Sequence, residues 1–391
     1  MAIATLVNTF GNGLFLTAAV LFYTRMLHLP PHQVGLGLTL AGLVALLVGV
    51  PAGHLADLRG AREVLMLLMV GLAAVMCVLP FVRGFPGFLA VMTGYAVLDR
   101  AGNAVRQGLI AGVFAADERV RGRAYLRAVT NLGISGGSAL AGVAIAIDSR
   151  AAYEALIVGD AATYLLAALA IRALPASGRR ERTRGDSMLT AIRDTPFLVV
   201  TVLCGLMALQ YSLLEVGLPL WVDRYTDAPR WTIAGLYLVN TIACVLFQVR
   251  ASAGATDLAS SARLNLRGAA FVAASCLVFA LSQGRAEGVA IVLLVLGAAV
   301  HVTGELFQSA GSWGLGFGLA PEHAQGQYQG LYSTGFAASM MLGPLVITST
   351  VIAWGRPGWY LLAAVFLLVG LALLPVTRWA ERHRNPAVLQ A

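Results

Sequence analysis

Two long apolar runs on either side of a short charged segment constrain the fold of this chain most strongly. Residues 34–52 and 64–82 contain no Asp, Glu, Lys, Arg or His. Each run is long enough to cross a hydrocarbon core of roughly 30 Å as a helix. The charged segment, residues 53–62, holds an aspartate and two arginines, which would each be costly in lipid. We therefore predict two membrane-spanning helices joined by a tight turn at a membrane surface.

The charged segment resembles a signature of the major facilitator superfamily, Gly-x-x-x-Asp-Arg/Lys-x-Gly-Arg-Arg, which lies between the second and third helices of that family. The residues that carry the resemblance are Gly53, Asp57, Gly60 and Arg62, with Arg59 one place after the usual basic position. The resemblance implies that these five residues form a gating hinge at the cytoplasmic ends of helices. If the resemblance is set aside, the same charged side chains could simply be solvated in a loop.

Composition excludes an ordinary soluble protein. Of the 391 residues, 58% are hydrophobic and only 12% are charged, whereas charged residues make up about 25% of soluble domains. The four cysteines lie inside apolar runs without metal-like spacing, so we expect neither disulfides nor a metal site. The start of the chain has no basic region or cleavage motif, so we expect no cleaved signal peptide.

The basic residues bear on partners and source. All 27 are arginine, which indicates a GC-rich, bacterial genome and excludes a lysine-containing phosphate loop. The net charge of +8 could suggest nucleic acid, but the arginines fall mainly between apolar runs, so we expect no nucleic-acid partner. Because no polar segment is large enough for a catalytic domain, we expect neither an enzyme nor a cofactor.

Apolar runs of about 20 residues predict an all-α membrane protein with twelve transmembrane helices. They fall near residues 5–26, 32–54, 62–82, 87–115, 124–147, 151–174, 196–222, 230–250, 265–283, 287–317, 327–353 and 357–377. The predicted domains are two pseudo-symmetric six-helix bundles, 1–174 and 196–378, with a cytoplasmic linker at 175–195 and a cytoplasmic tail at 379–391.

The placement of arginines predicts the orientation. If both termini are cytoplasmic, the cytoplasmic loops hold about twice as many arginines as the outer loops. We therefore predict a multi-pass protein of the bacterial inner membrane with both termini in the cytoplasm.

The two halves also resemble each other. With a shift of 204, residues 116–122 align with residues 320–326, and with a shift of 198, Pro31 aligns with Pro229. Transporter folds are often internal duplications whose binding site lies at the repeat interface. The resemblance between halves therefore favours a transporter.

Ionisable groups inside the predicted helices are functional candidates, because hydrocarbon cannot solvate them. The candidates for proton coupling are Asp99, Arg100, Asp160, Glu215, His301 and Glu305. Glu305 is the strongest, because it lies well inside its apolar run with His301 one turn earlier on the same face. Its carboxylate could carry a proton, bind the substrate, or form a hydrogen bond that only holds helices together.

The candidates for the substrate cavity lie on the same helices. They are Tyr211, Glu215, Asn240, Glu305 and Arg106. Tyr211 lies one turn before Glu215, and an aromatic ring beside a carboxylate suits an amphipathic or cationic solute. Glu215 could instead lean towards the outer headgroups.

Two further stretches resemble family motifs in part. Asp99 and Arg100 resemble the arginine-bearing motif of the fourth helix, which is associated with proton coupling, although Ala104 stands where a glycine is expected. Arg100 could instead only neutralise a buried acid such as Glu305 or Asp160.

The second stretch, residues 133–142, resembles the Gly-x-x-x-Gly-Pro-x-x-Gly-Gly motif of drug/proton antiporters. Ser138 replaces the proline and Ala141 replaces a glycine. Small residues at this density also allow helices simply to pack closely.

Together these features predict a monomeric secondary transporter of the multidrug-efflux type. We expect it to export small organic molecules in exchange for protons by alternating access, so its partners are the bilayer, a small-molecule substrate and protons. Two alternatives stay open: an importer of a small metabolite, for which Arg100 or Arg106 would suit an anion, and a non-transporting sensor or lipid-flipping protein.

Overall fold

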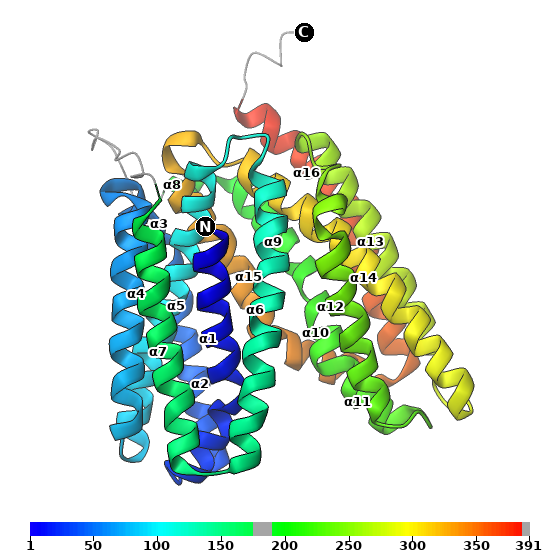
Figure 1. Ribbon diagram of the computed structural model, residues 1–391. Helices are drawn as coiled ribbons and strands as arrows, with labels where there is room; N and C mark the ends of the chain where they lie inside the picture. Colours follow the sequence, from blue (N-terminus) through cyan, green and yellow to red (C-terminus); the bar gives the residue numbers. More distant parts are fainter. Residues whose placement is uncertain (175–189, 385–391) are drawn as a thin grey trace. The chain divides into compact units, whose positions relative to one another are not determined.

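The computed structural model describes residues 1–174 and 190–384, and these residues form helices without a strand (Figure 1). The first helices are α1 (Ala2–Leu21), η1 (Phe22–Met26), α2 (Pro31–Leu46), α3 (Gly49–Arg59), α4 (Ala61–Val78), η2 (Leu79–Phe81), α5 (Gly84–Val113), α6 (Arg119–Ile147) and α7 (Arg150–Arg172). They are followed by α8 (Thr190–Arg193), α9 (Thr195–Ala208), α10 (Gln210–Ser212), η3 (Leu213–Gly217), α11 (Leu218–Tyr225), α12 (Trp231–Ser252), α13 (Leu258–Leu281), α14 (Glu287–Gly318), η4 (Glu322–Ala324), α15 (Gln325–Ile347), η5 (Thr348–Ile352) and α16 (Arg356–Arg384).

Within this part of the chain, ten helices are long and apolar enough to cross a membrane, or eleven if the bent pair α2–α3 is one span. The bend between α2 and α3 is 47°. Helix α5 is the twelfth segment; it has 30 residues but contains Asp99, Arg100 and Arg106, which lower its hydropathy. The predicted all-α membrane fold is confirmed, and its twelve helices are roughly where the apolar runs placed them.

The charged hinge is shorter than the sequence suggested. Helix α3 continues to Arg59 and α4 begins at Ala61, so Gly60 alone makes the turn. Gly60 has φ +95°, a conformation that residues with a Cβ rarely adopt. The predicted helix end at residue 54 is therefore too early, because one glycine in this conformation is enough to end α3 and start α4.

The described chain forms two compact units. As far as their residues are described, the first contains Met1–Ala115, Tyr125–Thr190 and Pro321–Thr334, and the second contains Ala116–Ala124, Ala191–Ala320 and Gly335–Ala391. Each unit thus includes one short segment from the other half of the sequence. These two segments overlap the stretches 116–122 and 320–326, which align with a shift of 204.

The predicted linker and tail fall partly outside the described residues. These are residues 175–189 of the linker 175–195 and residues 385–391 of the tail 379–391. The division into bundles at residues 1–174 and 196–378 stays a prediction. The two compact units do not test it directly, because each unit includes a short segment from the other half of the sequence.

In the first unit, α7 lies against α1 and α4, and α5 lies against α2, α3 and α4. The core includes an aromatic cluster in which Tyr23 meets Phe15 and Phe88 edge to face. The glycine-rich face of α6 lies against α1, because a Cβ on Gly137 would collide with the carbonyl oxygen of Phe10. Close helix packing therefore accounts for the glycines of this motif.

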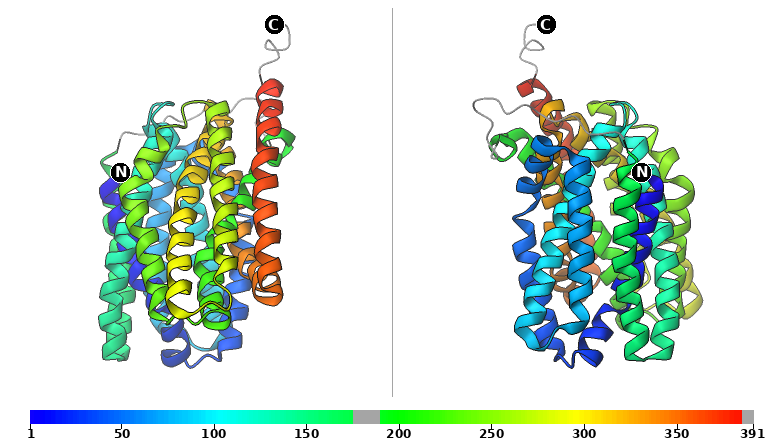
Figure 2. Two further views of the ribbon diagram at one scale, coloured as in Figure 1. Left: turned by 90° about the vertical axis from the view of Figure 1, so that its right-hand side faces the viewer. Right: turned by 60° about the vertical axis from the view of Figure 1, so that its left-hand side comes forward.

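In the second unit, α13 lies between α14 and α16, and α12 lies against α14 (Figure 2). The rings of Trp221, Phe279 and Trp359 are fully buried and contact one another through Trp359. The indole N–H of Trp221 donates to the hydroxyl of Ser282 at 2.9 Å. This aromatic cluster packs α11, α13 and α16 together.

Candidate functional site

Asp57 binds the N-terminus of α15. Its Oδ1 accepts a hydrogen bond from the backbone N–H of Gly326 at 2.8 Å, and its Oδ2 accepts one from Gln327 at 2.9 Å. These amides belong to the first turn of α15, where N–H groups have no partner within the helix and the helix dipole favours a negative charge. The carboxylate therefore occupies a defined anion site within the first unit.

Glycines allow this close approach. A Cβ on Gly53, one turn before Asp57, would collide with the carbonyl oxygen of Gly326, and a Cβ on Gly49 would meet the carbonyl oxygen of Gly330. The main chains of α3 and of the first turns of α15 thus touch directly, as glycine-containing helices in membranes can.

The two hinge arginines do not contact α15 in the same way. Arg62 donates from Nη1 to the carbonyl oxygen of Leu174 at 2.7 Å and pairs with Glu63 at 2.9 Å. The side chain of Arg59 is exposed. The structure therefore brings Gly53 and Asp57 to α15 and brings Arg62 to the end of α7.

Polar side chains of α1 and α5 meet inside the first unit. Asp99 accepts a hydrogen bond from Asn103 at 3.0 Å, and Arg106 donates to Asn8 at 2.5 Å. Arg100 and Arg106 both interact electrostatically with Asp99. Asp99 is thus the acid with which Arg100 interacts electrostatically.

Asp160 of α7 is fully buried in the same unit. Among the described residues, neither of its carboxylate oxygens has a hydrogen-bond partner. Its electrostatic neighbours include Asp99, Tyr23 and Tyr164. An ionised carboxylate here would have no compensating partner. Ionisation of Asp160 would therefore destabilise the first unit.

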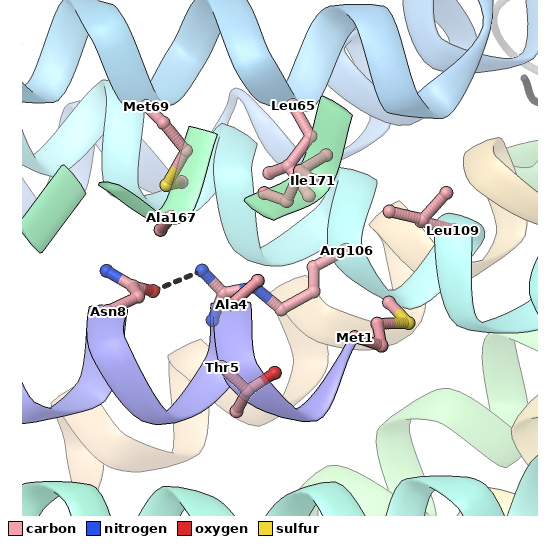
Figure 3. A pocket seen from close by; sticks show the side chains of 10 residues that line it. All are labelled: Met1, Ala4, Thr5, Asn8, Leu65, Met69, Arg106, Leu109, Ala167 and Ile171. Carbon is pink, nitrogen blue, oxygen red and sulfur yellow. Dashed lines mark hydrogen bonds between the residues drawn. The ribbon is translucent and has the colours of Figure 1, made fainter. Parts of the chain in front are cut away.

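A small cavity lies beside Arg106 (Figure 3). Its volume is about 10 Å³, and side chains of α1, α4, α5 and α7 line it, among them Asn8, Met69 and Ala167. A space of this size holds about one water molecule. Arg106, a predicted cavity residue, therefore borders a space too small for an organic solute.

Glu305 lies in the interior of the second unit, where it is 2% exposed. Its Oε2 accepts a hydrogen bond from Asn240 of α12 at 2.7 Å, and its Oε1 lies 3.8 Å from the thiol of Cys244. His301 is also buried, and its Nε2 lies 3.2 Å from the carbonyl oxygen of Gln210. Because a carbonyl oxygen only accepts, this nitrogen carries a proton. The structure thus brings together three predicted site residues.

A row of amides and hydroxyls continues from this group along α14. Gln210 donates to Gln308 at 2.8 Å, Gln308 donates to Ser312 at 2.7 Å, and Ser312 donates to Asn265 at 3.1 Å. Sequence reasoning missed this row because its members carry no charge. Their spacing on one helical face, at positions 301, 305, 308 and 312, was the available signal.

Tyr211 and Glu215 lie four residues apart at the junction of α10 and η3. Tyr211 lies in α10 and its ring packs edge-on against Phe336 at 5.6 Å, whereas Glu215 lies in η3 and is exposed. Whether they share one stripe towards a solute therefore stays a prediction. Glu215 still interacts electrostatically with Glu305, so it lies near the Glu305 group.

No group of three or more His, Cys, Asp or Glu side chains within residues 1–174 and 190–384 could hold a metal ion.

Comparisons with known proteins agree on the fold. The model of the Major Facilitator Superfamily matches residues 1–344, and no curated protein matches the chain. A bacterial homologue of the iron transporter ferroportin, solved in an outward-facing state, has a TM-score of 0.76 and 13% identity, with 97% of this chain and 98% of that chain covered.

Two other solved structures are similar. The human organic anion transporter TETRAN has a TM-score of 0.74 and 16% identity, covering 95% of this chain and 97% of that one. The Escherichia coli fucose:proton symporter FucP has a TM-score of 0.68 and 14% identity, covering 97% of both chains.

Proposed function

The chain belongs to the major facilitator superfamily, and from this premise we propose that it is a proton-coupled exporter of small amphipathic organic molecules. It would work by alternating access, as a monomer in a bacterial inner membrane with both termini in the cytoplasm. A transporter fold with polar groups inside each unit supports this proposal.

Glu305 is the observation that carries the proposal. The carboxyl group is almost completely buried and held by the neutral amide of Asn240. Proton coupling needs a group that gains and loses a proton inside the membrane, and a carboxyl group beside His301 meets that requirement. The same buried acid would attract a cationic or amphipathic solute when it is ionised.

Asp57 supplies the proposed gate. Each cycle would break its hydrogen bonds to Gly326 and Gln327 and form them again, so the strength of this contact would set how often each state is visited. On this account Asp57 controls the rate of transport more than the affinity for the solute.

Glu305→Gln tests the proposed coupling. Cells that express the wild type should exclude a panel of cationic dyes, and cells with Glu305→Gln should accumulate them. Glu287→Gln is the matched control, because Glu287 is exposed at the start of the same helix. Dye exclusion by Glu305→Gln equal to that of the wild type would refute the role of Glu305.

Uptake of a small anionic metabolite is a second candidate. A positive charge inside the first unit favours it, because the guanidinium of Arg106 is half-buried there and donates to the neutral side chain of Asn8. The cation panel and an equivalent panel of organic anions separate the two, because an anion importer would accumulate the anions and leave the dyes unaffected.

A further inference from the structure

A groove in the second unit lies apart from its polar interior. Its volume is about 500 Å³, within the range of about 300–1,000 Å³ that is typical of small-molecule sites. It is lined by side chains of α12 between Val239 and Ala251 and by side chains of α14 between Ala299 and Phe307. The groove is therefore built by two neighbouring helices of one unit.

The floor and walls of the groove are apolar. Val302 and Leu306 are almost completely buried, whereas Phe247 is 46% exposed. The hydroxyl of Thr303 donates to the carbonyl oxygen of Ala299 at 2.9 Å, so its one hydrogen-bond donor is used within α14. The groove thus offers a hydrocarbon surface along most of its length.

Arg250 is the charged residue among those that line the groove, and its side chain is exposed in the last turns of α12. It follows Val239, another lining residue, by eleven positions, which is about 16 Å along a helix. That length is about half of a hydrocarbon core of roughly 30 Å, or the depth of one leaflet. The polarity along the groove therefore matches that of a phospholipid, which has a long apolar part and a charged end.

We propose that this groove binds one anionic phospholipid of the bilayer, with an acyl chain along α12 and α14 and the phosphate on the guanidinium of Arg250. Guanidinium groups bind phosphate through paired, charge-assisted hydrogen bonds, and basic pockets between transmembrane helices bind anionic headgroups. This lipid site does not depend on the proposed transport activity.

Lipid titration of the purified full-length protein tests the site. Delipidated protein in detergent is titrated with phosphatidylglycerol or with phosphatidylcholine of the same acyl chains, and bound lipid is counted by native mass spectrometry. The wild type should prefer phosphatidylglycerol by about five-fold, the effect of one arginine near a headgroup. Arg250→Gln should abolish this preference and Arg250→Lys should keep most of it.

Two further variants sharpen the test. Arg263→Gln removes an exposed arginine of α13 that does not line the groove, so it should keep the preference for phosphatidylglycerol. Ala299→Phe fills the groove without changing the charge, so it should weaken binding of both lipids several-fold.

Three results would overturn the proposal. The first is an equal loss of preference in Arg250→Gln and Arg263→Gln, which would indicate diffuse surface charge. The second is lipid binding that Ala299→Phe leaves unchanged. The third is binding of a cationic dye that Ala299→Phe abolishes while phosphatidylglycerol binding persists, which would assign the groove to a solute. If Ala299→Phe does not fold, the two arginine variants decide alone, because both positions are exposed.

Discussion

Asp57 accepts a 2.8 Å hydrogen bond from the backbone amide of Gly326, 269 residues later in the chain. The contact joins α3 to the first turn of α15 within the first unit. It places a carboxylate at the positive end of the helix dipole. A second hydrogen bond, from the backbone amide of Gln327, holds the other carboxylate oxygen. On the proposed mechanism, this is the contact that transport must break and form again.

Removal of the charge should loosen this contact. In Asp57→Asn, one amide oxygen replaces two carboxylate oxygens, and charge-assisted hydrogen bonds are about twice as strong as neutral ones. A loss of about 1–2 kcal/mol at a helix N-terminus should change the transport rate about ten-fold while solute affinity changes less than about two-fold. Amide hydrogen exchange of residues 321–334 should become faster.

Asp117→Asn is the control for this prediction, because Asp117 is an exposed acid in the segment between α5 and α6. It should leave both transport and exchange unchanged. Transport and exchange in Asp57→Asn that match those of the wild type would remove Asp57 from the gate.

A methyl group at Gly53 should separate α3 from α15. Its Cβ would collide with the carbonyl oxygen of Gly326, and backbone atoms on both sides leave no flexible side chain to move away. We expect Gly53→Ala to destabilise this contact by about 1–3 kcal/mol, as overpacking commonly does, and to speed hydrogen exchange at Gly326.

Gly42→Ala is the matched control, because nothing lies within 4 Å of a Cβ at Gly42. Both variants replace a glycine in the bent pair α2–α3, so helix propensity changes in the same direction. Equal exchange rates in the two variants would contradict the steric account.

The ion pair at the α6–α7 turn should make stability depend on pH. The hydroxyl of Tyr153 donates to Asp148 at 2.9 Å and Arg25 pairs with it at 2.6 Å, and these two contacts lower the pKa of the Asp148 carboxyl. Because the folded-state pKa lies below the unfolded one, the stabilisation is complete above about pH 4 and is lost as the pH falls through the folded-state pKa.

Asp148→Asn should therefore lower the unfolding temperature near pH 7 and have progressively less effect in acid. Asparagine tolerates the left-handed conformation at this position, where φ is +48°, so backbone strain does not confuse the result. Asp227→Asn, at an exposed aspartate after α11, should show no such trend. A difference between Asp148→Asn and the wild type that is constant with pH would refute the effect.

Asp160 and Asp99 should respond differently to the same substitution. The carboxylate oxygens of Asp160 have no hydrogen-bond partner in the described residues, so Asp160→Asn should change stability by less than about 1 kcal/mol. Asp99→Asn removes the charge beside the half-buried Arg100 and Arg106, and loss of a partner to a partly buried charged group costs about 1–3 kcal/mol. Thermal unfolding in detergent measures both effects. A loss in Asp160→Asn as large as that in Asp99→Asn would contradict this distinction.

Hydrophobic length was enough to predict the helices. A membrane leaves few options other than a helix for an apolar run of 20 residues, and the twelve segments are close to their predicted places. The hinge was misjudged in extent, because the sequence does not show that Gly60 alone adopts φ +95° and that the residues before it stay helical.

The candidate site was predicted only in part. Charge in an apolar run singled out Glu305, and helical spacing put His301 beside it. The contacts from Asn240 and Gln210 depend on how α10 and α12 pack against α14, which no local pattern reveals. The π-turn η3, in which Glu215 lies, was also not visible in the sequence.

Simultaneous measurement of proton and solute movement tests the central claim most directly. Wild-type protein and Glu305→Gln are reconstituted in vesicles with an imposed pH gradient, and the internal pH and a cationic dye are followed together. We predict that the wild type moves dye against its gradient while the pH gradient collapses, and that Glu305→Gln does neither. Dye movement by the wild type without proton movement, or proton-coupled movement retained in Glu305→Gln, would contradict the account.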